Sequence, residues 1–505
     1  MGVRLWYHCG TIPQLDPAIG SSYGDHCRPD PMAGSSCAMD LEITLKETIT
    51  VRPSELQAAN IQTIELSGLD RISPAMLYTI FFFKSQLKND GENPIELERA
   101  KRALQRVLVS WYPAAGRFKF NETTGKLEID CNNKGVTMIT AVTESKLEEF
   151  GCLHEYKPCY EKLVPKLSQS SDVSENPLVL VQITSFACGG ISIGLGGSHA
   201  LFDGVGAFKF LASWAHVSSG KDESDLTFPN HSRDALLHAI SSPNYACPDT
   251  SAASIYEQDH VAAIQDLYRI PMQAMASDDR CWKTALSKFG QIDPQGELVL
   301  VTLSVKKVVV DAWKGMAIES GNLTRCSTFD VLCAHVWKAR VMALKLHPRT
   351  NICLQFPVDS RSRLRPPLGE NFTGNAFVLA SVSCSVKDLL KEPLHQTIQR
   401  IQEAKDVITD EYIKLYAKAL EYSSDKFFPS MRELTIITDW LRFPFHALDF
   451  GWGPRLSGAV LLATPVPETA FLMLDLEGGY LVRLGIEKKH VQNLINNFNN
   501  FDFKY

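Results

Sequence analysis

A histidine and an aspartate stand four residues apart, at His199 and Asp203, within a glycine-rich stretch. Before them, residues 191–195 alternate large apolar with small side chains, which predicts a buried strand. After them, apolar residues recur at helical spacing, at Phe208, Leu211 and Ala215. We therefore expect His199 where a strand ends and a helix begins. At that place its ring can face a cleft while its backbone stays fixed.

His199 has the chemistry of a general base, because neutral imidazole can accept a proton near pH 7. An acceptor hydroxyl or amine is a poor nucleophile until its proton is removed, and a positioned base typically contributes ~10²–10⁴ in rate. No serine or cysteine nucleophile accompanies the histidine. The pattern therefore implies that the acceptor attacks the second substrate directly, without a covalent intermediate on the enzyme. The alternative is a histidine packed in the core with no role.

The spacing of His199 and Asp203 means little by itself. The chain has 13 histidines, and since about a quarter of residues in an average protein are charged, roughly one such pair is expected by chance. His26 and Asp30 have the same spacing. They stand in a Pro/Ser/Gly-rich segment without a strand before them or a helix after them. The context of His199, and not the spacing, indicates a function.

Asp203 is expected to support the loop and not to react. A four-residue step at a strand-to-helix turn lets its carboxylate point back into the protein, where it requires a cation or a capping role. Gly204 follows Asp203 directly and is expected to have a structural role in the same loop.

The pentapeptide Asp-Phe-Gly-Trp-Gly at residues 449–453 admits two interpretations. In one it is a turn, in which Gly451 and Gly453 permit unusual backbone angles and the aromatic side chains fill the core. In the other, the indole N–H of Trp452 donates to the oxyanion of a tetrahedral intermediate, a contribution of ~3–4 kcal/mol. Trp452 and Asp449 are therefore both candidate catalytic residues beside His199.

Five stretches in this order carry a resemblance to a known family: residues 112–117 (Tyr-Pro-Ala-Ala-Gly-Arg), the histidine motif at 199–203, 359–363 (Asp-Ser-Arg-Ser-Arg), 372–375 (Phe-Thr-Gly-Asn) and 449–453. With these motifs the chain resembles the BAHD family of plant acyl-CoA-dependent acyltransferases, over roughly residues 45–500. The resemblance implies an α/β fold of two chloramphenicol-acetyltransferase-like sandwich domains with the active site between them.

The resemblance also implies roles for several residues. Asp203 would form a structural ion pair with an arginine, and Arg361 stands in the matching motif. Asp449 would usually be structural, although it is sometimes regarded as catalytic. Thr438 and Trp440 stand where the family tends to carry Thr-Ser-Trp along the acceptor or coenzyme pocket. Asp439 between them departs from that pattern, and the chain has no phosphate-binding glycine loop, so the residues that bind the CoA phosphates are not identified.

Composition limits the other possibilities. The chain has 505 residues, 45% hydrophobic and 21% charged, as in an ordinary globular protein. Its net charge of −6 argues against a nucleic-acid partner, which would require a basic face. No apolar run approaches the ~18 residues of a membrane-spanning helix, and the first residues do not form a signal peptide. The 13 cysteines include no Cys-x-x-Cys pair, which favours reduced thiols over disulfides or zinc. We expect a cytoplasmic monomer without bound metal or permanent cofactor, with acyl-CoA as co-substrate.

The element pattern predicts two mixed α/β halves. Residues 1–40 are interpreted as a disordered extension, with Met39 as an alternative start. Residues 41–220 and 296–505 are the two expected domains, and residues 221–295, including the polar stretch 231–234, are interpreted as a long surface connection. Expected strands include 76–83, 178–186, 191–195, 298–305 and 352–358. Expected helices begin near Asn93, Asp203, Ser327, Pro393 and Lys488, and His335 is predicted to be a packed helix residue.

The predicted function is transfer of an acyl group, hydroxycinnamoyl or another aromatic or aliphatic acyl, from acyl-CoA to an alcohol or amine. Members that place hydroxycinnamoyl groups on long-chain hydroxy fatty acids or fatty alcohols are nearest, because the link before Thr438 is short. A non-enzymatic accessory role in wax or cuticle lipid synthesis is the alternative, although such members tend to lose the Asp-Phe-Gly-Trp-Gly word. A peptide-synthetase condensation domain would show His-His, whereas Ser198 precedes His199 here.

Overall fold

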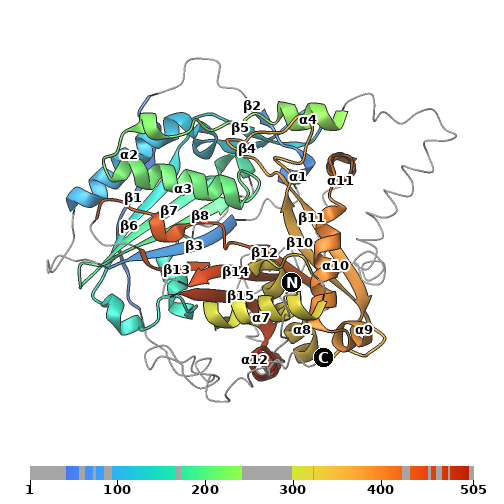
Figure 1. Ribbon diagram of the computed structural model, residues 1–505. Helices are drawn as coiled ribbons and strands as arrows, with labels where there is room; N and C mark the ends of the chain where they lie inside the picture. The colour runs from blue at the N-terminus through green and yellow to red at the C-terminus, as the bar shows by residue number, and fades with distance from the viewer. Residues whose placement is uncertain are drawn as a thin grey trace, which may run out of the picture. The chain divides into compact units, whose positions relative to one another are not determined.

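The computed structural model describes residues 41–55, 63–71, 76–84, 94–166, 170, 172–241, 298–321, 323–422, 433–452, 456–461, 469–475 and 478–499. Figure 1 shows their helices and strands. The predicted extension at residues 1–40 and positions 242–295 of the predicted connection lie outside these ranges.

The first sheet has six strands in the order β1-β6-β7-β8-β3-β13. Its centre is the antiparallel hairpin of β7 and β8, and all eight residues of β7 are buried, including the polar Gln182, Thr184 and Ser185. β3 pairs with β8 from end to end, so that Met76 lies opposite Ser198 and Phe83 opposite Ile191. The strand bounds are β1 Thr44–Val51, β3 Met76–Phe83, β6 Val136–Thr143, β7 Val179–Phe186, β8 Ile191–Ser198 and β13 Leu456–Leu461.

Two long helices, α2 (Pro94–Ser110) and α3 (Gly204–Ser218), pack side by side on one face of this sheet (Figure 1). The Trp214 indole of α3 donates to the Ala100 carbonyl of α2 over 2.8 Å. The opposite face is covered by the short helices η3 (Leu147–Phe150) and η4 (Pro158–Leu163), which pack on Phe82 of β3. A small sheet adjoins these layers and consists of β2 Thr63–Glu65, β4 Arg117–Phe120 and β5 Leu127–Asp130.

The second sheet also has six strands, in the order β11-β10-β12-β14-β15-β9. Its helical layer is centred on α8, whose N-terminus is closed by a capping box between Ser327 and Asp330. The strands are β9 Leu298–Lys306, β10 Asn351–Asp359, β11 Phe377–Ser385, β12 Leu434–Asp439, β14 Thr469–Asp475 and β15 Gly479–Glu487. The helices are α7 Lys307–Gly321, α8 Thr328–Leu344, α9 Val386–Lys391, α10 Leu394–Asp406, α11 Asp410–Tyr422 and α12 Val491–Asn499.

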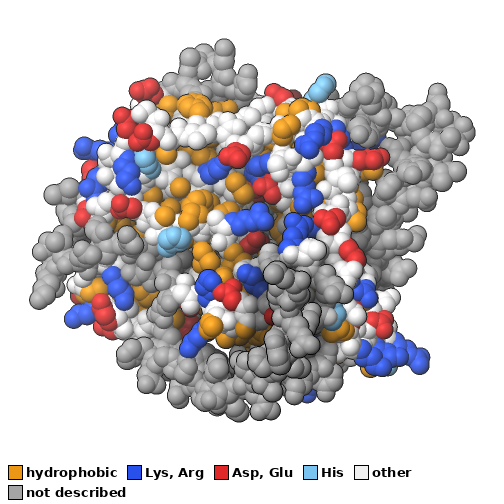
Figure 2. All heavy atoms as spheres, viewed as in Figure 1, with side chains coloured by type: hydrophobic (Ala, Val, Ile, Leu, Met, Phe, Trp, Pro, Cys, Tyr) orange, Lys and Arg blue, Asp and Glu red, His pale blue; other side chains and the backbone are white. Residues whose placement is uncertain are grey.

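Short elements complete the described chain. They are α1 Gly68–Arg71, α4 Asp234–Ser241, η2 Tyr112–Ala115, η5 Val173–Glu175, η6 Glu223–Asp225, η8 Phe445–Ala447 and η9 Lys488–His490. On the face drawn in Figure 2, basic and acidic side chains are interspersed among apolar ones over the described surface. None of the described helices is both long and apolar enough to cross a bilayer.

The two helix-covered sheets confirm the predicted α/β fold class. β13, although it lies within the range 296–505 expected for the second domain, pairs with β3 of the first sheet. His335 is fully buried on α8, as predicted, with its Nε2 2.9 Å from the Phe498 carbonyl. The interpretation of residues 231–234 as surface connection is wrong for two of them, since His231 and Arg233 are buried and hydrogen bonded.

Candidate active site

His199 follows the last residue of β8, at the expected boundary between strand and helix. Its side chain is partly exposed, and its ring lies edge-on to that of Phe377 in β11, with centroids 6.0 Å apart. The two sheets therefore meet at this histidine. Its backbone carbonyl accepts a hydrogen bond of 2.8 Å from Asn375 Nδ2.

The electrostatic surroundings keep the His199 ring available as a base. Burial lowers its pKa below the ordinary value. The charges of Asp203 and Asp70, a hydrogen bond to its own backbone and the Asn375 side chain raise the pKa, without reversing the direction. Because the net shift is downward, the neutral imidazole is the form present at pH 7.

Asp203 and Arg361 form the ion pair that the sequence motifs implied. Arg361 Nη2 lies 2.9 Å from Asp203 Oδ2, and both side chains are buried. Asp203 also caps α3, since its Oδ1 accepts from Gly206 N over 3.0 Å. Its Oδ2 accepts from Ala376 N at 3.2 Å. With these partners the Asp203 carboxylate holds the loop after His199.

A second buried carboxylate lies behind the same loop and was not identified from the sequence. Asp70 in α1 is fully buried and lies 3.4 Å from both Arg233 Nε and Arg233 Nη2. Its Oδ1 accepts from the backbone N–H and from Nδ2 of Asn375, at 3.0 and 2.9 Å. Burial raises the pKa of Asp70, but the Arg233 charge and the hydrogen bonds from Asn375 and Ser67 outweigh it and lower the pKa. Asp70 is thus held as a carboxylate.

His231 belongs to the same interior. Its Nδ1 is 2.7 Å from Thr373 Oγ1 and its Nε2 is 2.9 Å from the Ser110 carbonyl. Burial lowers the pKa of His231 to about 4, so the ring is neutral. With both nitrogens engaged by the protein, this histidine has a structural role. The only sequence signal for it was a polar run, which is equally typical of a surface loop.

Trp452 and Asp449 do not lie beside His199. The Trp452 ring packs edge-on against Phe83 at 5.5 Å, and Phe83 lies opposite Ile191 at the start of β8. His199 follows the other end of β8, seven residues further along. At ~3.3 Å per residue, the two ends of that strand are about 23 Å apart. An indole at this position is not placed to reach an oxyanion formed beside His199, so the geometry gives no support to the catalytic role of Trp452, which stays a prediction.

The segment before Gly453 is instead a turn that docks on the end of α3. Ser218 Oγ donates to the Phe450 carbonyl over 3.1 Å, and a Cβ on Gly451 (φ +76°) would come within 2.9 Å of Ser219 Cα. The exposed Asp449 accepts from Gly451 N over 2.8 Å. His199 precedes the opposite end of α3, so the geometry gives no support to the catalytic role of Asp449 either, and that role stays a prediction. Gly453 lies outside the described residues.

Thr438 and Trp440 lie on the side of β12 that faces away from the helices. Side chains alternate along a strand, and Ile437 belongs to the core formed with α8. Asp439 therefore points to the helical side, where its carboxylate accepts from Leu441 N over 2.9 Å. Trp440 contacts Phe471 of β14, at a centroid distance of 5.9 Å.

Trp440 belongs to an aromatic cluster that reaches the histidine loop. The cluster consists of Phe208, Trp440, Phe443, Phe445 and Phe471. All but Phe471 are partly exposed. The Phe443 ring lies against Gly204, where a Cβ would come within 3.0 Å of it. Gly204 thus leaves room for an aromatic ring one residue after Asp203.

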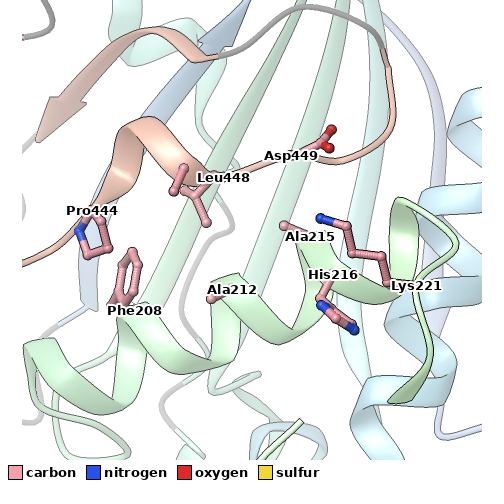
Figure 3. A pocket seen from close by; sticks show the side chains of 9 residues that line it. Phe208, Ala212, Ala215, His216, Lys221, Pro444, Leu448 and Asp449 are labelled. Carbon is pink, nitrogen blue, oxygen red and sulfur yellow. The ribbon is translucent and has the colours of Figure 1, made fainter. Parts of the chain in front are cut away.

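A cavity of about 130 Å³ continues from this cluster along α3, between the helix and the segment from Pro444 to Asp449 (Figure 3). Phe208 lines it at the end near the cluster, and His216 and Lys221 line it near the other end. Among the described residues, no three His, Cys, Asp or Glu side chains gather as they would around a metal ion.

Comparisons with known proteins identify a family and relatives for this chain. A family model described as the Transferase family matches residues 39–473. Brassinosteroid-related acyltransferase 1 of Arabidopsis thaliana is 36% identical, over 91% of this chain and 98% of that protein. Omega-hydroxypalmitate O-feruloyl transferase of the same plant is 31% identical, over 84% of this chain and 85% of that protein.

Solved structures share the fold. The crystal structure of vinorine synthase has a TM-score of 0.67 at 20% identity, covering 92% of this chain and all of that one. The F. graminearum protein TRI101, crystallised with coenzyme A and T-2 mycotoxin, has a TM-score of 0.64 at 14% identity, covering 85% of this chain and 96% of that one.

Proposed function

The chain belongs to the BAHD family of acyl-CoA-dependent acyltransferases, and from this premise we propose that it transfers an acyl group from acyl-CoA to the hydroxyl of an apolar acceptor, with His199 as general base. The observation that carries the proposal is the placement of His199. Its ring is partly exposed where the two sheets meet, and the loop that follows it is held by buried ion pairs.

In the proposed reaction, the neutral imidazole removes the hydroxyl proton while the acceptor oxygen bonds to the thioester carbon. The resulting tetrahedral intermediate collapses with cleavage of the carbon–sulfur bond. The imidazolium then returns its proton to the departing sulfur of CoA, so that an ester and free CoA leave. Ser198, which directly precedes His199, is buried at the end of β8, and no covalent acyl-enzyme is proposed.

The aromatic cluster supports an apolar substrate. Phe208, Trp440, Phe443 and Phe445 are only partly buried, and they adjoin the His199 loop through Gly204. Partly exposed aromatic side chains gathered beside a reactive group favour an apolar or aromatic ligand. Trp440, with Thr438 on the same face of β12, is proposed to line that site.

The names of the relatives also favour an apolar substrate. One is described as brassinosteroid-related, one as acting on omega-hydroxypalmitate, and a third, 29% identical over 84% of the chain, as a fatty alcohol:caffeoyl-CoA acyltransferase of Arabidopsis thaliana. These names support a hydroxycinnamoyl donor and a steroid or long-chain alcohol acceptor as the proposed substrates. They give no support to the accessory alternative, since all three describe acyltransferases.

The deciding experiment compares His199→Ala with wild type. Both are supplied with a panel of acyl-CoAs and with long-chain alcohol, sterol, shikimate-type acid and amine acceptors, and products are measured by mass. We expect wild type to prefer the apolar alcohols and His199→Ala to lose at least ~10²-fold in kcat.

The matched control is His238→Ala, which removes an exposed histidine of α4 and should leave transfer unchanged. If His199→Ala retained the wild-type rate, the proposed base would be refuted. Preference for the amine or the shikimate-type acid would refute the acceptor class alone.

A further inference from the structure

Asn375 is the residue that connects the interior to the His199 loop. It is fully buried, and its Nδ2 donates to two acceptors, the His199 carbonyl at 2.8 Å and Asp70 Oδ1 at 2.9 Å. An amide nitrogen has two protons, so these bonds use both. The opposite orientation of the amide would place its oxygen against a carbonyl and a carboxylate. The surroundings therefore fix which way the amide points.

The hydrogen bonds behind Asn375 fix its position. Asp70 Oδ1 also accepts from the Asn375 backbone N–H at 3.0 Å, so that one carboxylate oxygen binds this residue twice. Arg233, which pairs with Asp70, donates from Nη2 to the Leu201 carbonyl over 3.0 Å. Asn375 and Arg233 thus hold two carbonyls of the His199 loop, at residues 199 and 201. Both side chains are bound to Asp70.

The imidazole of His199 also interacts with the backbone of its own residue, and this interaction raises the pKa of the ring. Only Nδ1, the nitrogen nearer to Cβ, can reach the residue's own carbonyl. A proton held on Nδ1 leaves Nε2 unprotonated, which is the tautomer that a base requires. A carbonyl held in place would therefore favour this tautomer and fix the direction of the ring.

We propose that Asn375 is a positioning residue of the acyl transfer: through its double attachment to Asp70 it fixes the His199 carbonyl, which in turn keeps Nδ1 protonated and aims Nε2 at the acceptor. The inference rests on the proposed function of His199. It adds a role for the Asp70–Arg233 pair, which tethers the amide from the interior without contacting the substrate.

The test is the steady-state kinetics of Asn375→Ala across a pH range. A base misplaced by about 1 Å loses on the order of 10²-fold in rate, so we expect kcat to fall about 10- to 100-fold while KM for acyl-CoA stays near the wild-type value. The Asn375 side chain raises the pKa of His199. Its removal should therefore move the acid limb of the kcat profile to lower pH, an effect that a purely structural role would not produce.

Asn371→Ala is the matched control. Asn371 lies in the same segment, and its exposed Nδ2 donates to the Phe228 carbonyl over 3.2 Å, away from His199. It should retain the wild-type kcat and acid limb. If Asn375→Ala fails to fold, Asn375→Ser carries the same test, because it retains one donor and should show a smaller loss in the same direction.

Three results separate the possibilities. A lower kcat with a shifted acid limb supports the positioning role. A kcat within about threefold of wild type, or a loss that leaves the acid limb unmoved, overturns it while His199→Ala still abolishes transfer. If His199→Ala itself retains activity, the proposed function fails first, and the role of Asn375 fails with it.

Discussion

At the level of single residues, the Asp203–Arg361 pair joins segments 158 residues apart in the chain. Both side chains are buried, and the aspartate also caps α3. A buried charge without its partner is costly, because desolvation is no longer compensated. The stability of the loop after His199 should therefore depend on this carboxylate more than on any exposed cap.

Asp203→Ala should lower the free energy of unfolding by about 3 kcal/mol, near the low end for a broken buried pair, since Arg361 retains Asp359 at 3.2 Å. Urea denaturation measures the change. The matched control is Asp222→Ala, which removes an exposed aspartate capping η6 and should cost no more than about 1 kcal/mol. Equal losses in the two variants would show that burial of the pair contributes nothing.

The sequence predicted the Asp203–Arg361 pair only through a family resemblance. It did not predict the buried Asp70–Arg233 pair at all. Arg233 and Asp70 are 163 residues apart, and Asn375 and Asp70 are 305 apart. Local pattern does not contain such contacts, because they depend on how α1 and the segment after β10 come together. Asn375 is the last residue of the Phe-Thr-Gly-Asn motif at 372–375, but nothing in its neighbouring sequence indicated a chemical role.

At the level of elements, local periodicity was sufficient for much of the fold. β3 and β8 follow their apolar patterns, and α3 begins after the predicted cap Asp203. The Asp-Phe-Gly-Trp-Gly pentapeptide shows the limit of prediction from local sequence. A turn and an oxyanion site both use glycines beside an indole, and only the register of β3 on β8 places Trp452 at the far end from His199.

Trp452→Phe tests that placement. Phenylalanine retains apolar packing against Phe83 and Phe450 but removes the indole N–H, so we expect kcat within about threefold of wild type. Loss of an oxyanion donor would instead cost about 10²–10³ in kcat. Steady-state assays distinguish these results, and the larger loss would support a catalytic role for Trp452 against the geometric argument.

At the scale of the whole molecule, the sequence divides into two similar halves, yet the described sheets are not built from separate halves. β13 comes from residues 456–461 and pairs with β3 at the edge of the first sheet. Asp203 and Asp70, from the first half, are bound by Arg361 and Asn375, from the second. Each half therefore supplies parts that the other requires to satisfy its backbone and its buried charges.

This exchange predicts one cooperative unfolding transition for the chain. If residues 41–220 and 296–505 were independent domains, they would unfold separately, and the calorimetric enthalpy would exceed the van't Hoff enthalpy. Removing β13 from the first sheet exposes β3 as an unpaired edge, and separating the halves leaves buried charges without partners. Neither half should therefore remain folded when the other unfolds.

Differential scanning calorimetry should give equal calorimetric and van't Hoff enthalpies and a single peak. Asp203→Ala should move that whole peak to lower temperature. Two resolved peaks, with only one of them moved by the substitution, would show that the halves are energetically separate.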